Sequence, residues 1–169
     1  KSAVRFLKHH SEKFYIDTNK VAILGCSSGG HLASFIGATN QLKRFEGDDE
    51  YFENSSNVHA VINIDGILDF THPGESAKDT VLDKPSVGKL WLGYSYKENP
   101  KLWIEASPLT YFIETSPPVL FINSDIERFH AGRDEAIRIL NTHNIYNEVH
   151  TIKNSPHTFW FFQPWFDKI

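Results

Sequence analysis

The pentapeptide Gly25-Cys26-Ser27-Ser28-Gly29 constrains the fold of this chain more than any other part of the sequence. A wholly apolar run, residues 21–24, precedes it, and a helical stretch follows from His31 to about Thr39. In a G-x-S-x-G motif between a strand and a helix, the serine lies on a sharp, strained turn at the carboxyl end of a sheet. The segment therefore predicts a buried strand, an exposed Ser27 hydroxyl and a helix that begins beside it.

The glycines two residues before and after Ser27 are expected because a Cβ at either position would collide with the neighbouring backbone. Ser28 is the weaker candidate nucleophile, since Cys26 and not glycine stands two residues before it. The backbone N–H of Ser28 is instead predicted to face a developing oxyanion at the helix N-terminus. The alternative interpretation is a glycine- and serine-rich turn without chemistry.

Other short apolar runs follow the pentapeptide. Residues 58–64 end at Asp65-Gly66, and residues 119–122 follow two prolines. A helical stretch from 133 to about 141 then leads to a fourth predicted strand near 148–152. Apolar strands that alternate with helical connections indicate a parallel sheet wound in right-handed βαβ units. The prediction is one α/β domain over residues 1–169, with four mostly parallel strands flanked by helices.

The remaining segments are predicted as follows. Residues 2–14 form an amphipathic helix with one packed side, and residues 40–56 form a polar surface loop. The long connection over residues 67–116 is rich in proline, glycine and aromatic residues, and connections of this length carry function or small helices of their own. The packed side of the first helix comprises Ala3, Val4, Leu7, His10, Ser11 and Phe14.

A base for Ser27 is expected in a loop after the last strand, because such folds order the residues as serine, acid and histidine along the chain. Among the nine histidines, His157 alone has this position, in Asn154-Ser155-Pro156-His157. His150 lies within the preceding strand. His31, in the first turn of the helix after Ser27, is interpreted as a packing residue.

The acid is expected after the third strand, within residues 123–134. Three carboxylates there remain candidates. Counting from the strand end favours Glu127, and Asp134 is the second choice, although a carboxylate in the first turn of a helix is common as a partner of the helix dipole. Asp125 fits if the segment is aligned on the following helix.

Composition excludes several classes of function. The formal net charge of −4 gives no electrostatic basis for binding nucleic acid or an anionic membrane surface. No apolar run approaches the length of about 18 residues that indicates a membrane span. The single cysteine, Cys26, cannot form an internal disulfide or a cysteine zinc cluster. Neither a metal nor an organic cofactor is predicted.

The motifs resemble a known family. GCSSGGHLA is similar to the serine turn of acetyl-esterases and carbohydrate esterases of the α/β-hydrolase type, and LWLGYSYKENPKLWIEASPLTY resembles a stretch before their penultimate strand. FINSDIERFHAGRDE and NSPHTFW resemble a bacterial subgroup described as pectin or xylan acetyl-esterase-like. The similarity extends over nearly the whole chain.

This resemblance implies a serine esterase that removes acetyl or similar small acyl groups from plant polysaccharides, with Ser27 and His157 in the catalytic roles and a secreted or periplasmic location. The alternatives are a serine peptidase of the prolyl-oligopeptidase type and an inactive or binding remnant of the fold. The four tryptophans suit stacking on sugar rings and suit an ordinary core equally well. They are Trp91, Trp103, Trp160 and Trp165.

The chain departs from the family pattern in an upstream motif and in its number of strands. Such enzymes carry a His-Gly-Gly-Gly-like loop upstream of the serine turn, which supplies a second oxyanion donor, and no such motif precedes Gly25. The sequence also shows only half of the strands of that fold and contains no methionine. The expectation is a carboxyl-terminal-half fragment whose first strand has an unpaired, association-prone edge, with little activity when produced alone.

Overall fold

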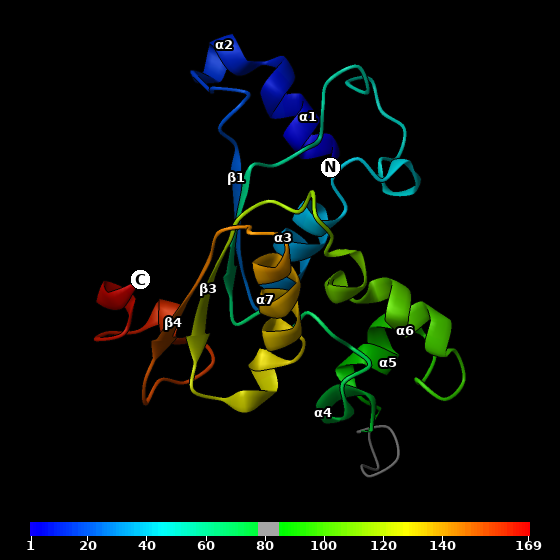
Figure 1. The fold of residues 1–169 in the computed structure, drawn as a ribbon, viewed down its shortest axis with the longest axis vertical. Helices are drawn as coiled ribbons and strands as arrows, with labels where there is room; N and C mark the ends of the chain where they lie inside the picture. Colours follow the sequence, from blue (N-terminus) through cyan, green and yellow to red (C-terminus); the bar gives the residue numbers. More distant parts are fainter. Residues whose placement is uncertain (78–84) are drawn as a thin grey trace.

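The computed structural model describes residues 1–77 and 85–169, and its centre is one sheet of four parallel strands (Figure 1). The strands are β1 (Ala22–Cys26), β2 (Ala60–Ile64), β3 (Val119–Ser124) and β4 (Asn147–Ile152), and they lie side by side in that order. Ile64, the last residue of β2, pairs with Cys26 of β1 and with Ile122 of β3. The predicted four-stranded parallel sheet is confirmed.

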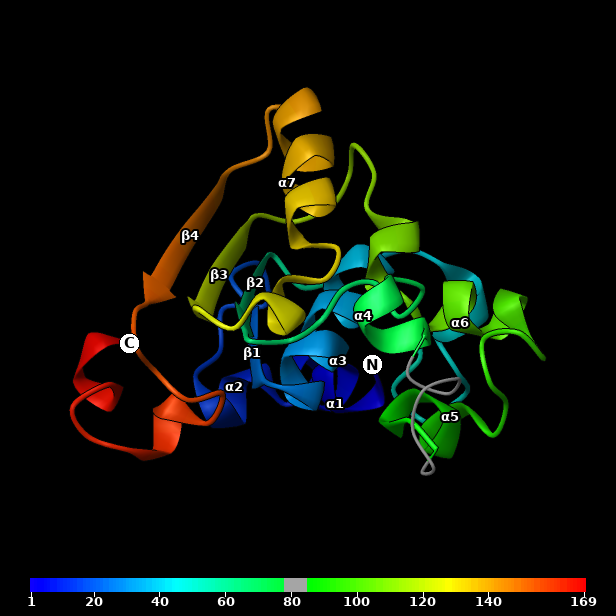
Figure 2. The same cartoon turned by 90° about the horizontal axis from the view of Figure 1, so that it is seen from below.

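Helices cover one face of this sheet, and the carboxyl-terminal segment covers part of the other (Figure 2). Helices α3 and α7 lie on the first face; η5 and η6 belong to the segment on the second. The helices are α1 (Ser2–His9), α2 (Ser11–Phe14), α3 (Ser28–Ala38), η1 (Lys43–Phe45), α4 (Pro73–Ser76), α5 (Val87–Leu92), α6 (Pro100–Ala106), η3 (Pro108–Tyr111), η4 (Glu127–His130), α7 (Arg133–Thr142), η5 (Phe159–Phe161) and η6 (Phe166–Lys168).

Alternation along the strands supplies both faces with apolar side chains. In β2, Val61 packs in the cluster on the helical side, whereas Ile62 and Ile64 pack in the cluster that contains Phe159 of η5. In β3, Phe121 belongs to the first cluster. β2 and β3 are mostly buried on both faces, and it is their short, nearly continuous apolar runs, without an alternating pattern, that identified them in the sequence.

The amino-terminal helix prediction is wrong in its packing. The chain forms two helices, α1 and α2, and the buried side chains of α1 are Arg5 and Lys8, while Leu7 and Phe14 are each 40% exposed. Arg5 forms ion pairs with Glu46 and Asp49 of the loop that follows α3. Lys8 donates to the Asn57 carbonyl at 2.7 Å. Because this helix packs against a polar loop, these two cationic side chains are buried, while Val4 of the predicted side packs against the core.

The edge position predicted for the first strand is confirmed. β1 pairs with β2 on one side, and within residues 1–77 and 85–169 no strand pairs with its other side. Leu24 of β1 is 56% exposed. Across the same described residues, no helix combines the length and apolar character needed to cross a membrane.

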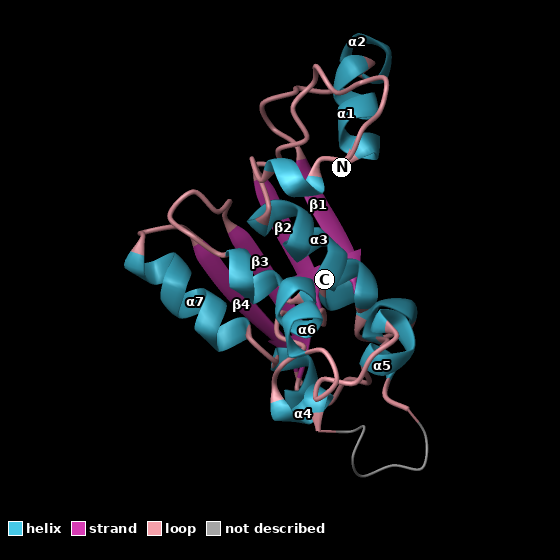
Figure 3. Ribbon diagram, turned by 90° about the vertical axis from the view of Figure 1, so that its right-hand side faces the viewer, coloured by secondary structure: helices cyan, strands magenta, loops and turns pink. Residues whose placement is uncertain are grey.

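The parallel arrangement places the carboxyl ends of all four strands at one end of the molecule (Figure 3). Helices α4, α5 and α6, from the long connection between β2 and β3, lie at this end, whereas α1 and α2 lie at the opposite end. The expectation of small helices within that connection is confirmed outside residues 78–84. Loops that follow parallel strands form the ligand-binding end of most α/β sheets.

Candidate active site

Ser27 lies on the sharp turn that the pentapeptide predicts. β1 ends at Cys26 and α3 begins at Ser28, and Ser27 between them has φ 54° and ψ −121°. This region is strained for a residue with a side chain, and such strain persists only where the surroundings enforce it. Here the Ser27 N–H donates to the Ile64 carbonyl at 2.8 Å, and the Ser27 carbonyl accepts from the His31 N–H at 3.0 Å.

The two glycines of the motif differ in whether their surroundings leave space for a Cβ. A Cβ at Gly25 would lie 2.0 Å from the carbonyl oxygen of Gly29, which belongs to the backbone of α3 and cannot move aside. A Cβ at Gly29 would have no atom of the described residues within 4 Å, apart from its chain neighbours and the backbone of its own helix. The expected collision is therefore found at Gly25, and the expectation for Gly29 is wrong. Gly30 is the tighter position, because a Cβ there would lie 3.0 Å from the Asn63 side chain.

This difference predicts opposite effects of two matched substitutions. Gly25→Ala should lower the free energy of unfolding by about 2 kcal/mol or more, because overpacking against backbone cannot relax. Gly29→Ala should be neutral or stabilise by up to about 1 kcal/mol, since alanine restricts the unfolded chain and favours a helix. Urea unfolding followed by circular dichroism measures both. Equal effects of the two substitutions would contradict this explanation of the turn.

His157 reaches Ser27 from the loop after β4. Its Nε2 atom lies 2.8 Å from Ser27 Oγ, and its side chain is 23% exposed. The loop is held by Ser155, whose hydroxyl donates to the Ile152 carbonyl at 2.6 Å. The Asn154 N–H donates to the Asp125 carboxylate at 2.8 Å. The predicted pairing of Ser27 with His157 is thus present in the geometry.

Asp65 is the carboxylate that meets the other nitrogen of this histidine. His157 Nδ1 lies 3.0 Å from Asp65 Oδ2, and the Asp65 side chain is fully buried. Ser124, at the end of β3, donates its N–H to Oδ1 at 2.8 Å and its hydroxyl to Oδ2 at 2.6 Å, and the Asn123 amide donates to Oδ1 at 3.2 Å. A buried carboxylate requires this degree of hydrogen bonding to offset its lost hydration.

The expectation that the carboxylate partner of His157 follows the third strand is wrong in this structure. Glu127 is exposed at the start of η4, and Asp134 is 69% exposed and paired with Arg133. Asp125 accepts from the loop backbone at Asn154 and not from the imidazole. The physical reason is that β2 and β3 are adjacent and parallel, so a residue directly after either strand reaches the same place.

A sequence signal for Asp65 did exist. It is the first residue after the apolar run 60–64, and it precedes Gly66, whose Cα packs against α3 so closely that a Cβ would lie 2.4 Å from the Gly30 carbonyl carbon. Asn63 completes this corner, because its amide donates to the Gly66 carbonyl at 3.0 Å and accepts from the Gly66 N–H at 2.7 Å. Asp65 itself has φ 49°. A polar residue at the carboxyl end of a buried parallel strand is a candidate site residue on position alone.

His31 joins α3 to α6 beneath the serine. It is 4% exposed, and its Nε2 lies 2.8 Å from the Ala106 carbonyl oxygen at the end of α6. Burial lowers the pKa of His31 from its ordinary value, and the hydrogen bond to the Ala106 carbonyl opposes this effect. The interpretation of His31 as a packing residue agrees with these contacts.

A cavity of about 390 Å³ opens above Ser27. Ser27 and Ser28 lie at its base, and Phe70 and Trp91 contribute apolar walls. Because Ser28 is the first residue of α3, its N–H has no partner within the helix. The cavity therefore combines a hydroxyl, a helix N-terminus and an apolar wall, which suits a small ligand with one polar reacting group.

An ion pair borders the same cavity. Arg128 of η4 binds Glu75 of α4 through two contacts, Nε to Oε1 at 2.5 Å and Nη2 to Oε2 at 3.1 Å. The Glu75 side chain is 4% exposed, and its hydrogen bond raises the pKa of Arg128 above the ordinary value.

Burial and the nearby charge of Asp65 raise the pKa of the Cys26 thiol.

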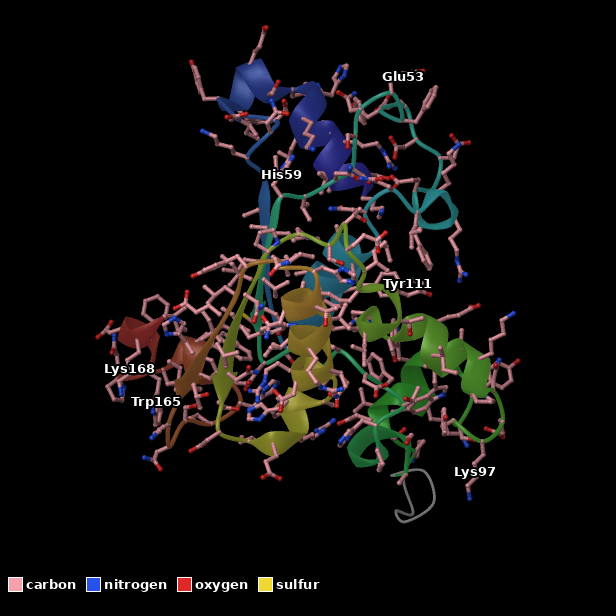
Figure 4. The ribbon with its side chains drawn as sticks, in the orientation of Figure 1. Glu53, His59, Lys97, Tyr111, Trp165 and Lys168 are labelled. Atoms are coloured by element: carbon pink, nitrogen blue, oxygen red, sulfur yellow. The ribbon has the colours of Figure 1, made fainter. Side chains whose placement is uncertain are left out.

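The four tryptophans do not share one surface. Trp103 is fully buried, whereas Trp91 of α5 is 55% exposed and lines the cavity. Trp160 meets the His157 ring edge-on, with centroids 5.2 Å apart. Trp165 lies on the carboxyl-terminal segment, away from the side that carries α5 (Figure 4). Trp91 is therefore the tryptophan placed to contact a ligand in the cavity.

The strand, the strained serine turn and the following helix, with a histidine and a buried aspartate converging from later strand ends, define an α/β-hydrolase fold that carries a Ser–His–Asp array. A family model described as BD-FAE matches residues 1–147, and the chain belongs to the BD-FAE family. Ser27 and Asp65 lie within the matched residues; His157 lies beyond them.

Similar proteins agree with this class. The probable carboxylic ester hydrolase LipM of Mycobacterium tuberculosis is 24% identical over 92% of this chain, which spans 34% of LipM. A solved structure of a truncated carbohydrate esterase from gut microbiota superposes with a TM-score of 0.75 at 22% identity, covering 98% of this chain and 62% of that protein. An acetyl ester-xyloside bifunctional hydrolase from Caldicellulosiruptor lactoaceticus superposes with a TM-score of 0.64 at 21% identity, covering 90% of this chain and 53% of that protein. The chain thus spans about a third of its curated relative.

Proposed function

We propose that this chain carries the nucleophile, base and acid of a carboxylic-ester hydrolase that acts through an acyl-enzyme on Ser27. The observation that carries the proposal is the continuous contact from the Asp65 carboxylate through both His157 nitrogens to the Ser27 hydroxyl, at 3.0 and 2.8 Å. Names of similar proteins, a carboxylic ester hydrolase and a carbohydrate esterase, support the same class.

The geometry suggests a role for each group. Asp65 accepts from His157 Nδ1–H and so leaves Nε2 unprotonated toward Ser27. The Ser27 hydroxyl donates to Nε2 and gives up its proton as Oγ attacks the ester carbonyl. The resulting imidazolium is stabilised by the buried carboxylate and then protonates the leaving alcohol. A water molecule, deprotonated by His157, releases the acid from the acyl-enzyme.

Two hydrogen-bond donors are proposed to stabilise the oxyanion that forms on the ester carbonyl. The Ser28 N–H lies at the N-terminus of α3 and is proposed as one of them. A donor from an upstream loop would be the second, as the family resemblance implies. Losing one oxyanion donor lowers kcat by about 10²–10³-fold. Residues 1–169 produced alone would have the Ser28 N–H but not the upstream donor, so we expect them to have little activity.

The substrate is proposed to be a small acyl ester, acetyl above all, on a plant polysaccharide. The cavity volume of about 390 Å³ and the exposed Trp91 ring accommodate an acyl group and one face of a sugar ring. The similar acetyl ester-xyloside hydrolase and carbohydrate esterase support this substrate class.

Two measurements test the proposal on the natural protein at its full length. A fluorophosphonate probe should label the protein at Ser27, as mapped by mass spectrometry, and Ser27→Ala should abolish labelling. Acetylated xylan should release acetate faster than a peptide amide with the same acyl group is cleaved. Absence of labelling would indicate a binding module, and preference for the peptide amide would indicate a peptidase.

A further inference from the structure

Phe129 of η4 lies flat against the His157 imidazole. The ring centroids are 3.5 Å apart and the ring planes differ by 6°. Phe129 is only half-buried, and it belongs to none of the three apolar clusters formed by the described residues. Packing into the core therefore does not explain this aromatic side chain, which contacts the histidine and also lines the cavity at Ser27.

The two residues beside Phe129 fix its backbone from both directions. Arg128 is held by the two contacts to Glu75 of α4. His130 Nε2 lies 2.8 Å from the carbonyl oxygen of Ser124, the residue whose N–H and hydroxyl bind Asp65. The turn that carries Phe129 is thus attached to the segments after β2 and at the end of β3.

The next two residues attach the same turn to the loop that follows Asp65. The Ala131 carbonyl accepts from the Leu68 N–H at 2.8 Å and from the Asp69 N–H at 3.2 Å. Gly132 has φ 79°, and a Cβ there would lie 2.8 Å from Asp69 Cβ. Residues 128–132, Arg-Phe-His-Ala-Gly, therefore contact the surroundings of both the acid and the base.

The stack restricts a motion that the hydrogen bonds leave free. His157 contacts Asp65 through Nδ1 and Ser27 through Nε2. With only these two contacts, the imidazole ring can still tilt about the line that joins its two nitrogens. A parallel aromatic face opposes this tilt. It also attracts the imidazolium more than the neutral imidazole, since a cation over an aromatic face is favoured electrostatically by the ring quadrupole. Such a contact strengthens as the transition state forms and so acts on kcat.

On these grounds we propose that Phe129 is a positioning residue for the base: its ring holds the plane of His157, and the flanking Arg128–Glu75 ion pair holds the turn that presents Phe129. The proposal rests on the proposed esterase function. It assigns a purpose to the Arg-Phe-His-Ala-Gly segment, which the Ser–His–Asp contacts leave unexplained.

Two variants of the natural full-length protein, assayed on p-nitrophenyl acetate, test the proposal. Phe129→Leu keeps an apolar side chain but removes the flat ring, and it should lower kcat about 10–100-fold, as small misplacements of catalytic groups do, with a smaller change in KM. Phe129→Tyr keeps the stack and should retain kcat within about threefold. The same order is expected for the rate of fluorophosphonate labelling at Ser27, because labelling also requires the base.

Melting temperatures separate positioning from folding. Phe129→Leu should melt within about 2 °C of the wild type, since substitutions at partly exposed sites outside a core are mild. Retention of kcat in Phe129→Leu, an equal loss in Phe129→Tyr, or a loss confined to KM would overturn the proposal. If wild-type protein is neither labelled nor active, the proposed function fails; if it is both and Phe129→Leu matches it, the positioning role alone fails.

Discussion

Replacing Ser27 by alanine is expected to lower kcat by about 10³-fold or more while leaving the fold intact. The hydroxyl is the atom from which the acyl-enzyme would form, and it is the hydroxyl that lies 2.8 Å from His157 Nε2. Alanine also fits the turn, because the strained φ of 54° is enforced by backbone hydrogen bonds on both sides of the residue. Initial rates on p-nitrophenyl acetate and a thermal melt measure the two effects.

Ser28→Ala is the matched control for that experiment. Its proposed contribution is a backbone N–H, which alanine retains, so kcat should change little. Near-normal turnover by Ser27→Ala, or an equally large loss in Ser28→Ala, would remove Ser27 from the role of nucleophile.

Replacing Asp65 by asparagine is expected to lower kcat by about 10⁴-fold, the size of effect seen when the acid of such a triad loses its charge. The amide oxygen can still accept from the Ser124 N–H at the Oδ1 position. The NH₂ group would then face His157 Nδ1 and require that nitrogen to be the acceptor. The ring proton would move to Nε2, where it blocks proton transfer from Ser27.

Glu127→Gln and Asp134→Asn are the controls for the acid. Both side chains are exposed, and neither is the carboxylate that contacts His157 in this structure, so each variant should keep kcat within about twofold. A melt of Asp65→Asn is needed beside them, because altering a buried, hydrogen-bonded carboxylate costs about 1–3 kcal/mol of stability as well. A steep loss in Glu127→Gln with a mild effect of Asp65→Asn would reverse the assignment.

The sequence by itself determined the features that local patterns control. The apolar runs identified β1, β2 and β3, and the alternation of strands with helical connections indicated the parallel sheet that also contains the mostly polar and exposed β4. The pentapeptide identified the turn at Ser27, since one motif specifies the strand, the turn and the helix together. Chain order then left His157 as the histidine after the last strand, and the structure brings it to 2.8 Å from Ser27.

Only the tertiary structure decided which carboxylate meets His157. Asp65 and Glu127 both follow the serine and precede the histidine, so chain order fits either one. Their difference arises between strands: β3 lies beside β2, and Ser124 at its end offers two donors to a carboxylate in the position of Asp65. The stack of Phe129 on His157 and the burial of Arg5 by a distant acidic loop depend on pairings of the same kind. The hydrophobic periodicity of a sequence does not predict contacts between residues far apart in the chain, because these contacts depend on how the strands and loops are assembled.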